Sequence, residues 1–276
     1  MSLVAQDEEK RSFIKGIFSS IKSKQNACAK CFSKYKFSKL SGFTRTCLPP
    51  IGSGYKGQIL FVGTNPRCNM GTEDEDFYRY ALSSERNFVQ FSTDGKYLDS
   101  YGNPKFLFND PYYDLYKQCL WKVDGSWSLG VKSSAAELFM CGSKDANIFY
   151  RDKPNNLYKK YSLDRYICAE QYFVNYLKLV KPKVIVSVGW IPMQWFQARF
   201  RDKLMKNTYR INQGNVKKYY GSPERDIITD LHGCFCKIQV DGEPTTVIFS
   251  LHPNARDFSP QKRNELLNSF AIALRN

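Results

Sequence analysis

The stretch QILFVGTNP (residues 58–66) decides the fold, because a short apolar run ends there in a sharp turn. An unbroken apolar run that closes on a glycine is typical of a strand buried on both faces. Two later stretches have the same character, VIVSVG (184–189) and TTVIFSL (245–251). Strands of this kind occur in parallel sheets that helices cover on both sides.

Segments with a helical spacing of apolar residues lie around these strands. They span residues 9–24, 168–180, 190–200 and 261–274, and ELFMC (137–141) adds a further core strand. The alternation predicts an α/β fold, a three-layer α/β/α sandwich with a central, mainly parallel four-stranded sheet. We interpret residues 1–276 as a single domain, with the cysteine-bearing segment 1–50 packed on it and an insertion near 142–162.

Two other regions are interpreted differently. Residues 228–242 and 245–251 form a predicted β-hairpin across the turn Asp241-Gly242. Residues 68–132 fit no regular pattern, and we expect helices joined by long loops there. The aromatic part of this region, residues 97–127, either lines a wide pocket or belongs to the core.

The net charge is +15, from 41 Lys and Arg against 26 Asp and Glu. Such a surplus favours a polyanionic partner, because each cation placed on a phosphate releases a counterion, although a solvated basic surface is the alternative. No apolar run reaches the roughly 18 residues that cross a bilayer, and the N-terminus lacks the apolar stretch of a secretory signal. We therefore expect an intracellular protein without a membrane partner. Its nine cysteines are then better interpreted as ligands or core thiols than as disulfides.

Two polar residues stand directly after predicted strands, where ligands of α/β sheets bind. Asn65 is suited to orienting a water molecule, and His252 to stabilising negative charge on a leaving group. Each also has a structural interpretation, as an Asn-Pro turn and as a strand-end histidine held by the backbone. The second histidine, His232, is assigned the structural role.

Taken together, the motifs Gly63-Thr64-Asn65-Pro66 and His252-Pro253-Asn254-Ala255-Arg256 resemble those of the uracil-DNA glycosylase superfamily. The helix, Lys-Pro-Lys and strand of residues 168–189 are similar to a segment of that family. The resemblance covers about residues 28–275, with gaps between 68 and 130. It implies a monomer that hydrolyses the N-glycosidic bond of a base flipped out of single- or double-stranded DNA, without cleaving the strand.

The resemblance also implies roles for particular residues. Asn65 and His252 are the expected catalytic residues. Contacts to the flipped base are expected from Gly63, Thr64, Pro66, Phe77 and Glu137, and contacts to DNA from Pro253, Asn254, Ala255 and Arg256. The basic stretch 199–218 is either a phosphate contact or a solvated face.

Four cysteines, Cys28, Cys31, Cys141 and Cys168, resemble the ligand set of the iron–sulfur branch of this superfamily. That branch implies a structural [4Fe–4S] cluster, and the alternatives are zinc on the same residues or no metal. The wide spacing between Cys141 and Cys168 departs from the family. The remaining cysteines are expected to be structural: Cys47, Cys68, Cys119, Cys234 and Cys236.

Glu137 departs from the family in a way that affects specificity, because the family places an asparagine there to recognise uracil. An ionised carboxylate only accepts hydrogen bonds and suits an amino group, such as N4 of cytosine. Three explanations stay open: a protonated Glu137, a slipped alignment, or a base other than uracil, such as a hypermodified cytosine. A strand residue that faces away from the site is the structural alternative. The rival functions are a non-catalytic DNA-binding member of the superfamily and a nucleotide-binding or redox protein, although the latter lacks a glycine-rich phosphate loop.

Overall fold

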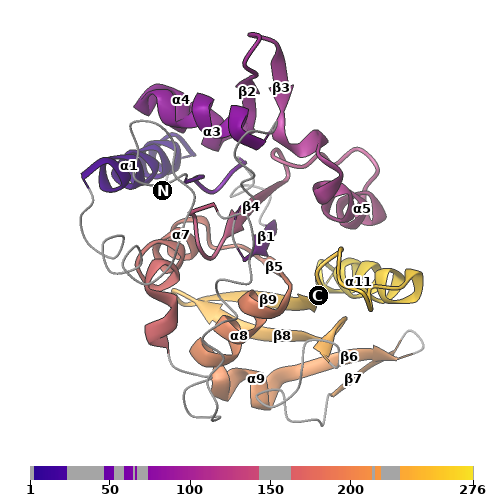
Figure 1. Ribbon diagram of the computed structural model, residues 1–276. Coiled ribbons are helices and arrows are strands. Elements are labelled where there is room, and N and C mark those ends of the chain that lie inside the picture. The colour runs from indigo at the N-terminus through magenta and orange to yellow at the C-terminus, as the bar shows by residue number, and fades with distance from the viewer. Residues whose placement is uncertain are drawn as a thin grey trace.

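A computed structural model describes residues 3–23, 47–52, 59–64, 66, 74–142, 163–212, 215–218 and 231–275. Within these ranges the chain forms an α/β fold around a mixed seven-stranded sheet, with strand order β4-β1-β5-β9-β8-β6-β7 (Figure 1). The strands are β1 (Ile59–Gly63), β4 (Ser133–Glu137), β5 (Val184–Val188), β6 (Thr208–Asn212), β7 (Asn215–Lys218), β8 (Phe235–Val240) and β9 (Glu243–Ser250). The predicted α/β class is confirmed.

The first four strands in this order, β4, β1, β5 and β9, are parallel to their neighbours. All five residues of β1 and all five of β5 are buried, as their continuous apolar runs predict. Strand β4 uses small residues instead, Ser133 to Ala136, and these are buried too. The carboxyl ends of these four strands therefore lie along one edge of the sheet.

The sheet continues beyond β9 with antiparallel strands, so a four-stranded sheet was too small a prediction. The hairpin of β8 and β9 turns at Asp241 and Gly242, which both have positive φ, as the sequence predicted. Strands β6 and β7 follow at the edge, in the basic stretch 199–218. Strand β6 pairs with β8 and β7 with β6, and their polar sequence has no apolar run because they bury few side chains of their own.

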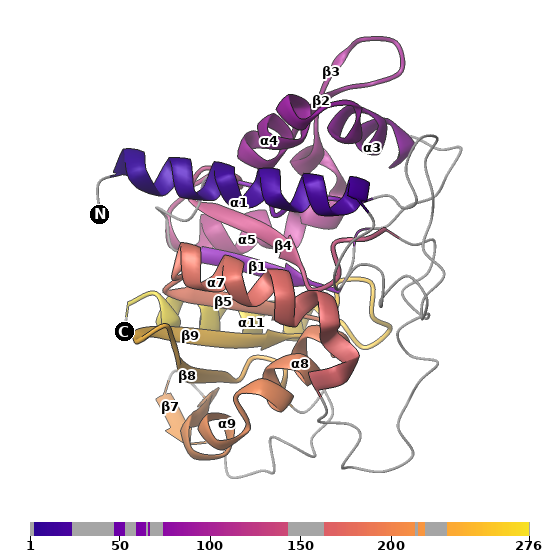
Figure 2. The same ribbon diagram turned by 90° about the vertical axis from the view of Figure 1, so that its left-hand side faces the viewer.

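Helices lie on both faces of the sheet (Figure 1). They are α1 (Leu3–Ser23), α3 (Asp74–Ser83), α4 (Glu85–Asp94), α5 (Asp114–Val123), α7 (Val174–Val180), α8 (Trp190–Arg199), α9 (Arg201–Asn207) and α11 (Pro260–Ala273). Figure 2 shows α1, α7 and α8 in front of the sheet, with α5 and α11 behind it. None of the helices described is long and apolar enough to cross a membrane.

Helix α1 packs on the domain through the apolar face that its sequence predicts. Ile14, Ile17, Phe18 and Ile21 are all buried. The ring of Phe18 lies 5.3 Å from that of Phe88 in α4, measured between centroids. The N-terminal helix is therefore part of the core.

Two details between residues 68 and 142 differ from expectation. Strand β4 ends at Glu137, where the predicted strand ELFMC begins, because small residues form the strand and the apolar ones follow it. The next residues stay attached to β1, since the amide of Leu138 donates to Gly63 O and that of Phe139 to Thr64 O. A projecting hairpin, β2 (Lys96–Leu98) and β3 (Pro104–Phe106), was not foreseen (Figure 2). Of the predicted insertion, all but Gly142 lies outside the described residues.

Candidate active site

The carboxyl edge of the parallel strands brings together residues far apart in the sequence. Gly63 ends β1 and is the register partner of Glu137, which ends β4. On the other side of β1, Val188 of β5 pairs with Ser250 of β9, two residues before His252. Three of the predicted site residues therefore share one edge of the sheet.

Gly63 and Glu137 are in contact. A Cβ atom on residue 63 would overlap the Glu137 carboxylate, including its Oε2 atom. Any side chain at position 63 would displace this carboxyl group. The glycine of the motif GTNP therefore leaves space for Glu137.

Glu137 is a partly buried residue, and no described group compensates one of its two carboxyl oxygens. Its Oε2 atom is inaccessible and has no hydrogen-bond partner among the described residues. Burial raises the pKa of Glu137 from 4.5 to about 8. At neutral pH most of this group is therefore a neutral carboxylic acid, which agrees with the first of the three explanations for a glutamate at this position.

His252 follows β9 and is partly buried. Its Nδ1 atom accepts a hydrogen bond of 3.1 Å from the amide of Asn254. Burial lowers the pKa of His252, so the ring is neutral near pH 7. A neutral ring that accepts at Nδ1 carries its proton on Nε2, and this Nε2–H donor has no partner in the described part of the chain.

The loop after His252 is a tight turn that holds itself together. The amide of Ala255 donates to His252 O at 2.9 Å, and that of Phe258 donates to Ala255 O. Asn254 and Arg256 are exposed, whereas Pro253 and Ala255 are partly buried. The two exposed side chains are the ones positioned to contact a partner.

A tyrosine cluster faces these residues, formed by Tyr112, Tyr113 and Tyr116 of the helical turn Pro111–Tyr113 and α5. The ring of Tyr112 lies 5.6 Å from that of His252, centroid to centroid, and its hydroxyl lies 3.4 Å from that of Tyr116. Burial raises the pKa of all three hydroxyls, and the charge of Glu137 raises them further. The tyrosines thus lie close to both Glu137 and His252.

Sequence analysis did not single out Tyr112. The available signal was the run PYYDLY. It lies in the segment 97–127, for which the sequence allows either a pocket lining or a place in the core. In the structure Tyr116 stacks on Phe61 of β1 at 4.4 Å, in the core, while Tyr112 lies against His252.

The other predicted residues of the site differ in whether the structure describes them and in where they lie. Asn65 lies outside the described residues. Its neighbours are described, with Thr64 partly buried and Pro66 buried. Phe77 of α3 makes its ring contacts with Tyr78, Phe91 and Tyr97, in the core between α3, α4 and β2. Its described ring contacts therefore do not bring it to Glu137 and His252.

Two of the four predicted cluster ligands can be located. Cys141 and Cys168 are both buried, as cluster ligands would be, and Cys28 and Cys31 lie outside the described residues. Cys141 forms an antiparallel bridge with Cys47, and Cys168 precedes a π-helical turn, Ala169–Phe173. Within the described ranges, no group of three or more His, Cys, Asp or Glu side chains could hold a metal ion.

Cys234, just before β8, and Cys236, within it, contact different elements. Arg210 Nε lies 3.2 Å from Cys234 Sγ, and Cys236 Sγ lies 3.6 Å from Lys203 O. Burial raises the pKa of Cys236 to about 12, and that of Cys119 rises for the same reason. These thiols stay protonated and are suited to packing, as expected for structural cysteines.

His232 is held on both ring nitrogens. Its Nδ1 atom accepts from the amide of Leu251 at 3.0 Å, and Nε2 donates to Lys262 O at 2.6 Å. The residue is 2% exposed. This pattern fits the structural role assigned from the sequence, because the ring ties the end of β9 to α11.

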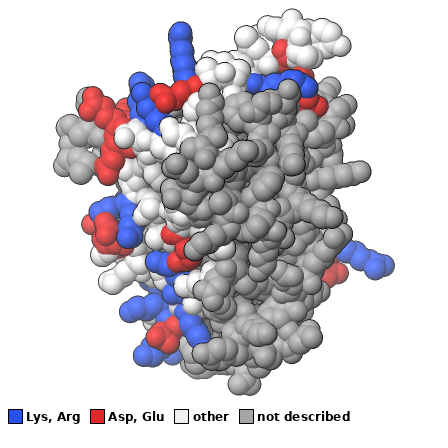
Figure 3. Space-filling view, turned by 60° about the vertical axis from the view of Figure 1, so that its left-hand side comes forward, with Lys and Arg blue, Asp and Glu red and all other residues white. Residues whose placement is uncertain are grey.

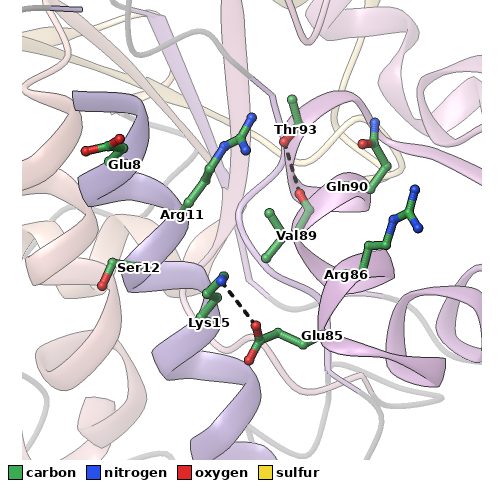
Figure 4. A pocket seen from close by; sticks show the side chains of 9 residues that line it. All are labelled: Glu8, Arg11, Ser12, Lys15, Glu85, Arg86, Val89, Gln90 and Thr93. Carbon is green, nitrogen blue, oxygen red and sulfur yellow. Dashed lines mark hydrogen bonds and ion pairs between the residues drawn. The ribbon is translucent and has the colours of Figure 1, made fainter. Parts of the chain in front are cut away.

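A separate groove between α1 and α4 has a volume of about 630 Å³ (Figure 4). Charged residues of both signs line it, among them Arg11, Lys15 and Glu85, and Lys15 pairs with Glu85 at 3.3 Å. It is formed by neither the strand ends nor the histidine loop.

Lys and Arg are likewise interspersed with Asp and Glu on the described part of the face in Figure 3. The described surface in that view therefore has no field of a single sign.

Compared with protein-family models and with curated proteins, the sequence matches none. Functional argument therefore depends on the geometry of the sheet edge and on the motifs that it carries.

Proposed function

We propose that this protein is a monofunctional DNA glycosylase, which hydrolyses the N-glycosidic bond of a uracil or another deaminated or modified base flipped out of DNA. The observation that carries the proposal is the neutral His252, whose Nε2–H donor lies unpartnered among the described residues at the sheet edge that also holds Glu137. A donor without a described partner and a carboxyl group with one inaccessible oxygen, at one sheet edge, suit the recognition of a polar planar ligand.

His252 would stabilise the leaving base. When the glycosidic bond breaks, its electron pair stays on the base, and negative charge develops on the base oxygen nearest the bond. A neutral imidazole that donates from Nε2 can hydrogen-bond this oxygen without first losing a proton. A preorganised donor of this kind contributes about 3–4 kcal/mol to transition-state stabilisation.

Asn65 would orient the water molecule, as the resemblance of the GTNP motif implies. The water oxygen forms the new bond to the anomeric carbon, and its proton passes to solvent. Gly63 and Thr64 anchor the segment just before Asn65, because their carbonyls accept from Leu138 and Phe139. No lysine nucleophile takes part, so the product is an abasic site in an intact strand.

Tyr112 is a candidate for stacking on the flipped base. Its partly buried ring lies tilted at 45° against His252, which leaves the tyrosine and the imidazole side by side at the edge. Aromatic faces bind unstacked bases favourably. The exposed Asn254 and Arg256, with Pro253 and Ala255, would contact the DNA around the extruded nucleotide.

A [4Fe–4S] cluster on Cys28, Cys31, Cys141 and Cys168 remains part of the proposal. The burial of Cys141 and Cys168 fits thiolate ligands of a structural cluster. Such a cluster would tie residues 28–31 to the end of β4 and the start of the π-helical turn. The same four residues could instead hold zinc.

Two alternatives keep the fold, one with another substrate and one without catalysis. A glycosylase for hypermodified cytosine would suit a carboxyl group at position 137. A non-catalytic DNA-binding member is the second alternative, but it needs neither an uncompensated buried carboxyl nor an oriented imidazole at the sheet edge.

Oligonucleotides, single- and double-stranded, that carry uracil, hypoxanthine, xanthine, 5-hydroxymethylcytosine or its glucosylated form test the proposal. Alkali converts each abasic site into a strand break that a gel resolves. We expect cleavage of at least one of them, and its loss in Asn65→Ala and His252→Ala with DNA binding retained. No abasic site on any of these substrates would overturn the glycosylase proposal.

A further inference from the structure

The Glu137 carboxyl group has surroundings that select its neutral form. Gly63 of β1 lies against it, and Tyr112, Tyr113 and Tyr116 are the titratable groups that face it from the helical turn and α5. No described cation offsets its burial. Its Oε2 atom is inaccessible and lacks a hydrogen-bond partner within the described ranges. A buried polar atom without a partner is uncommon in a folded protein, and this one lies at the sheet edge that also carries His252.

A neutral carboxyl group differs from both a carboxylate and an amide as a recognition element. A carboxylate offers only acceptors, and an amide offers a donor and an acceptor at fixed atoms. A carboxylic acid offers one donor and one acceptor, and the proton can occupy either oxygen. It can therefore match an adjacent donor and acceptor in either order.

We propose that Glu137 binds the N3 and C4 edge of the flipped base as a neutral carboxylic acid, so that the site accepts 4-oxo and 4-amino pyrimidines alike. The inference rests on the proposed glycosylase function and names its substrate class. A 4-oxo pyrimidine donates from N3–H to the carboxyl C=O and accepts the acid proton at O4. A 4-amino pyrimidine donates from N4–H and accepts the acid proton at N3.

Ionisation of Glu137 then weakens recognition of both classes. With a 4-oxo pyrimidine, N3–H still donates to one carboxylate oxygen, while O4 faces the other, so two acceptors meet. With a 4-amino pyrimidine, N4–H still donates to one oxygen, while N3 faces the other. Each class loses one of its two contacts, so raising the pH through 8 should weaken recognition of both.

Single-turnover cleavage of uracil and 5-hydroxymethylcytosine oligonucleotides, followed between pH 6 and pH 9, tests this inference. For the wild type we expect cleavage of both substrates to fall above pH 8, approaching tenfold per pH unit. Glu137→Gln keeps a donor and an acceptor but cannot ionise, so its profile should be flat across this range. Glu85→Gln, in the groove between α1 and α4, is the matched control and should follow the wild type.

A readout independent of activity is the carbonyl stretch of the protonated acid in difference infrared spectra of wild type against Glu137→Gln. We expect this band at pH 7 and its loss as the pH rises past 8, with circular dichroism confirming that both proteins are folded. If Glu137 is ionised at pH 7, the inference is wrong. It is equally wrong if cleavage occurs with the same pH profile in wild type and Glu137→Gln. A protein that cleaves no oligonucleotide overturns the proposed function and this inference together.

Discussion

The two histidines of the chain lie near the same end of β9 and differ in what their Nε2 atoms meet. Both accept a backbone hydrogen bond at Nδ1, from Leu251 in the case of His232 and from Asn254 in the case of His252. Burial lowers the pKa of both. The Nε2–H of His232 donates to Lys262 O, whereas that of His252 has no partner in the described part of the structure.

This difference separates a structural histidine from a candidate catalytic one more clearly than position or burial does. A buried polar group is ordinarily satisfied within the fold. His232 meets this rule, and its two bonds join β9 to α11. His252 is only partly buried, and its Nε2–H is left available to a ligand. The predictions that follow test whether His232 contributes mainly to stability and His252 mainly to activity.

The largest expected effect concerns activity. His252→Ala removes the donor to the leaving base, and we expect kcat for the cleaved oligonucleotide to fall about 10²–10³-fold, as for an oxyanion-hole donor. The free energy of unfolding should change by less than about 1 kcal/mol, because the ring's one described hydrogen bond lies in a partly exposed loop. Single-turnover kinetics and urea denaturation measure the two quantities. A large loss of stability with little loss of rate would reverse the roles assigned to the two histidines.

The second largest effect concerns stability and the other histidine, His232. His232→Ala leaves the amide of Leu251 and the carbonyl of Lys262 without their partner in a buried site, and we expect the free energy of unfolding to fall by about 2–4 kcal/mol. Activity should fall less than about tenfold at a temperature where the variant is folded. His232→Gln retains one donor and one acceptor and should recover part of the stability. Stability unchanged in His232→Ala would show that the ring does not hold β9 to α11.

The parts of the fold that the sequence predicted are those whose residues act locally. The apolar runs of β1 and β5, the helical period of α1 and the turn Asp241-Gly242 each carry their own signal. Strands β6 and β7 carry none, because pairing of β6 with β8, and of β7 with β6, holds them in the sheet. The small residues of β4 likewise form a strand only because β1 lies beside them.

For the candidate site too, some features could be predicted from the sequence and others could not. The positions of Gly63, Glu137 and His252 at strand ends follow from the parallel sheet and could be predicted. The surroundings of the Glu137 carboxyl could not, since they depend on Gly63 and on tyrosines of the turn Pro111–Tyr113 and α5, more than 20 residues away in the chain. Tyr112 had no signal of its own, because an aromatic run looks the same in a core and in a pocket.

A third test concerns protonation. Because the folded pKa of each histidine lies below its ordinary value of 6.5, the unfolded chain binds more protons in mildly acidic solution. Stability contributed by the neutral rings is thus present above pH 6.5 and is lost as the pH falls below it, by at most ~1.4 kcal/mol per pH unit for each ring.

Histidine NMR titration of the wild type and the two alanine variants resolves the two rings, since the chain has only these two. We expect both in the Nε2–H form at pH 7, with midpoints below 6.5. A DNA oligonucleotide that contains the substrate base should shift only the Nε2–H signal of His252. An equal shift at His232 would remove the distinction between the two histidines.

The smallest expected effect comes from the ring beside His252. Tyr112→Leu removes an aromatic face worth about 0.5–1.5 kcal/mol in ring–ring contact, so we expect cleavage to slow by roughly 3–10-fold. Tyr112→Phe keeps the face and gives up only the long hydroxyl contact of 3.4 Å to Tyr116, so it should cleave at nearly the wild-type rate. Equal losses in the two variants would assign the effect to the hydroxyl and not to stacking. The ring of His232 contacts a phenylalanine instead, since it meets Phe258 edge to face at 5.8 Å. Because His232 has the structural role, Phe258→Leu should lower the free energy of unfolding and leave the cleavage rate unchanged.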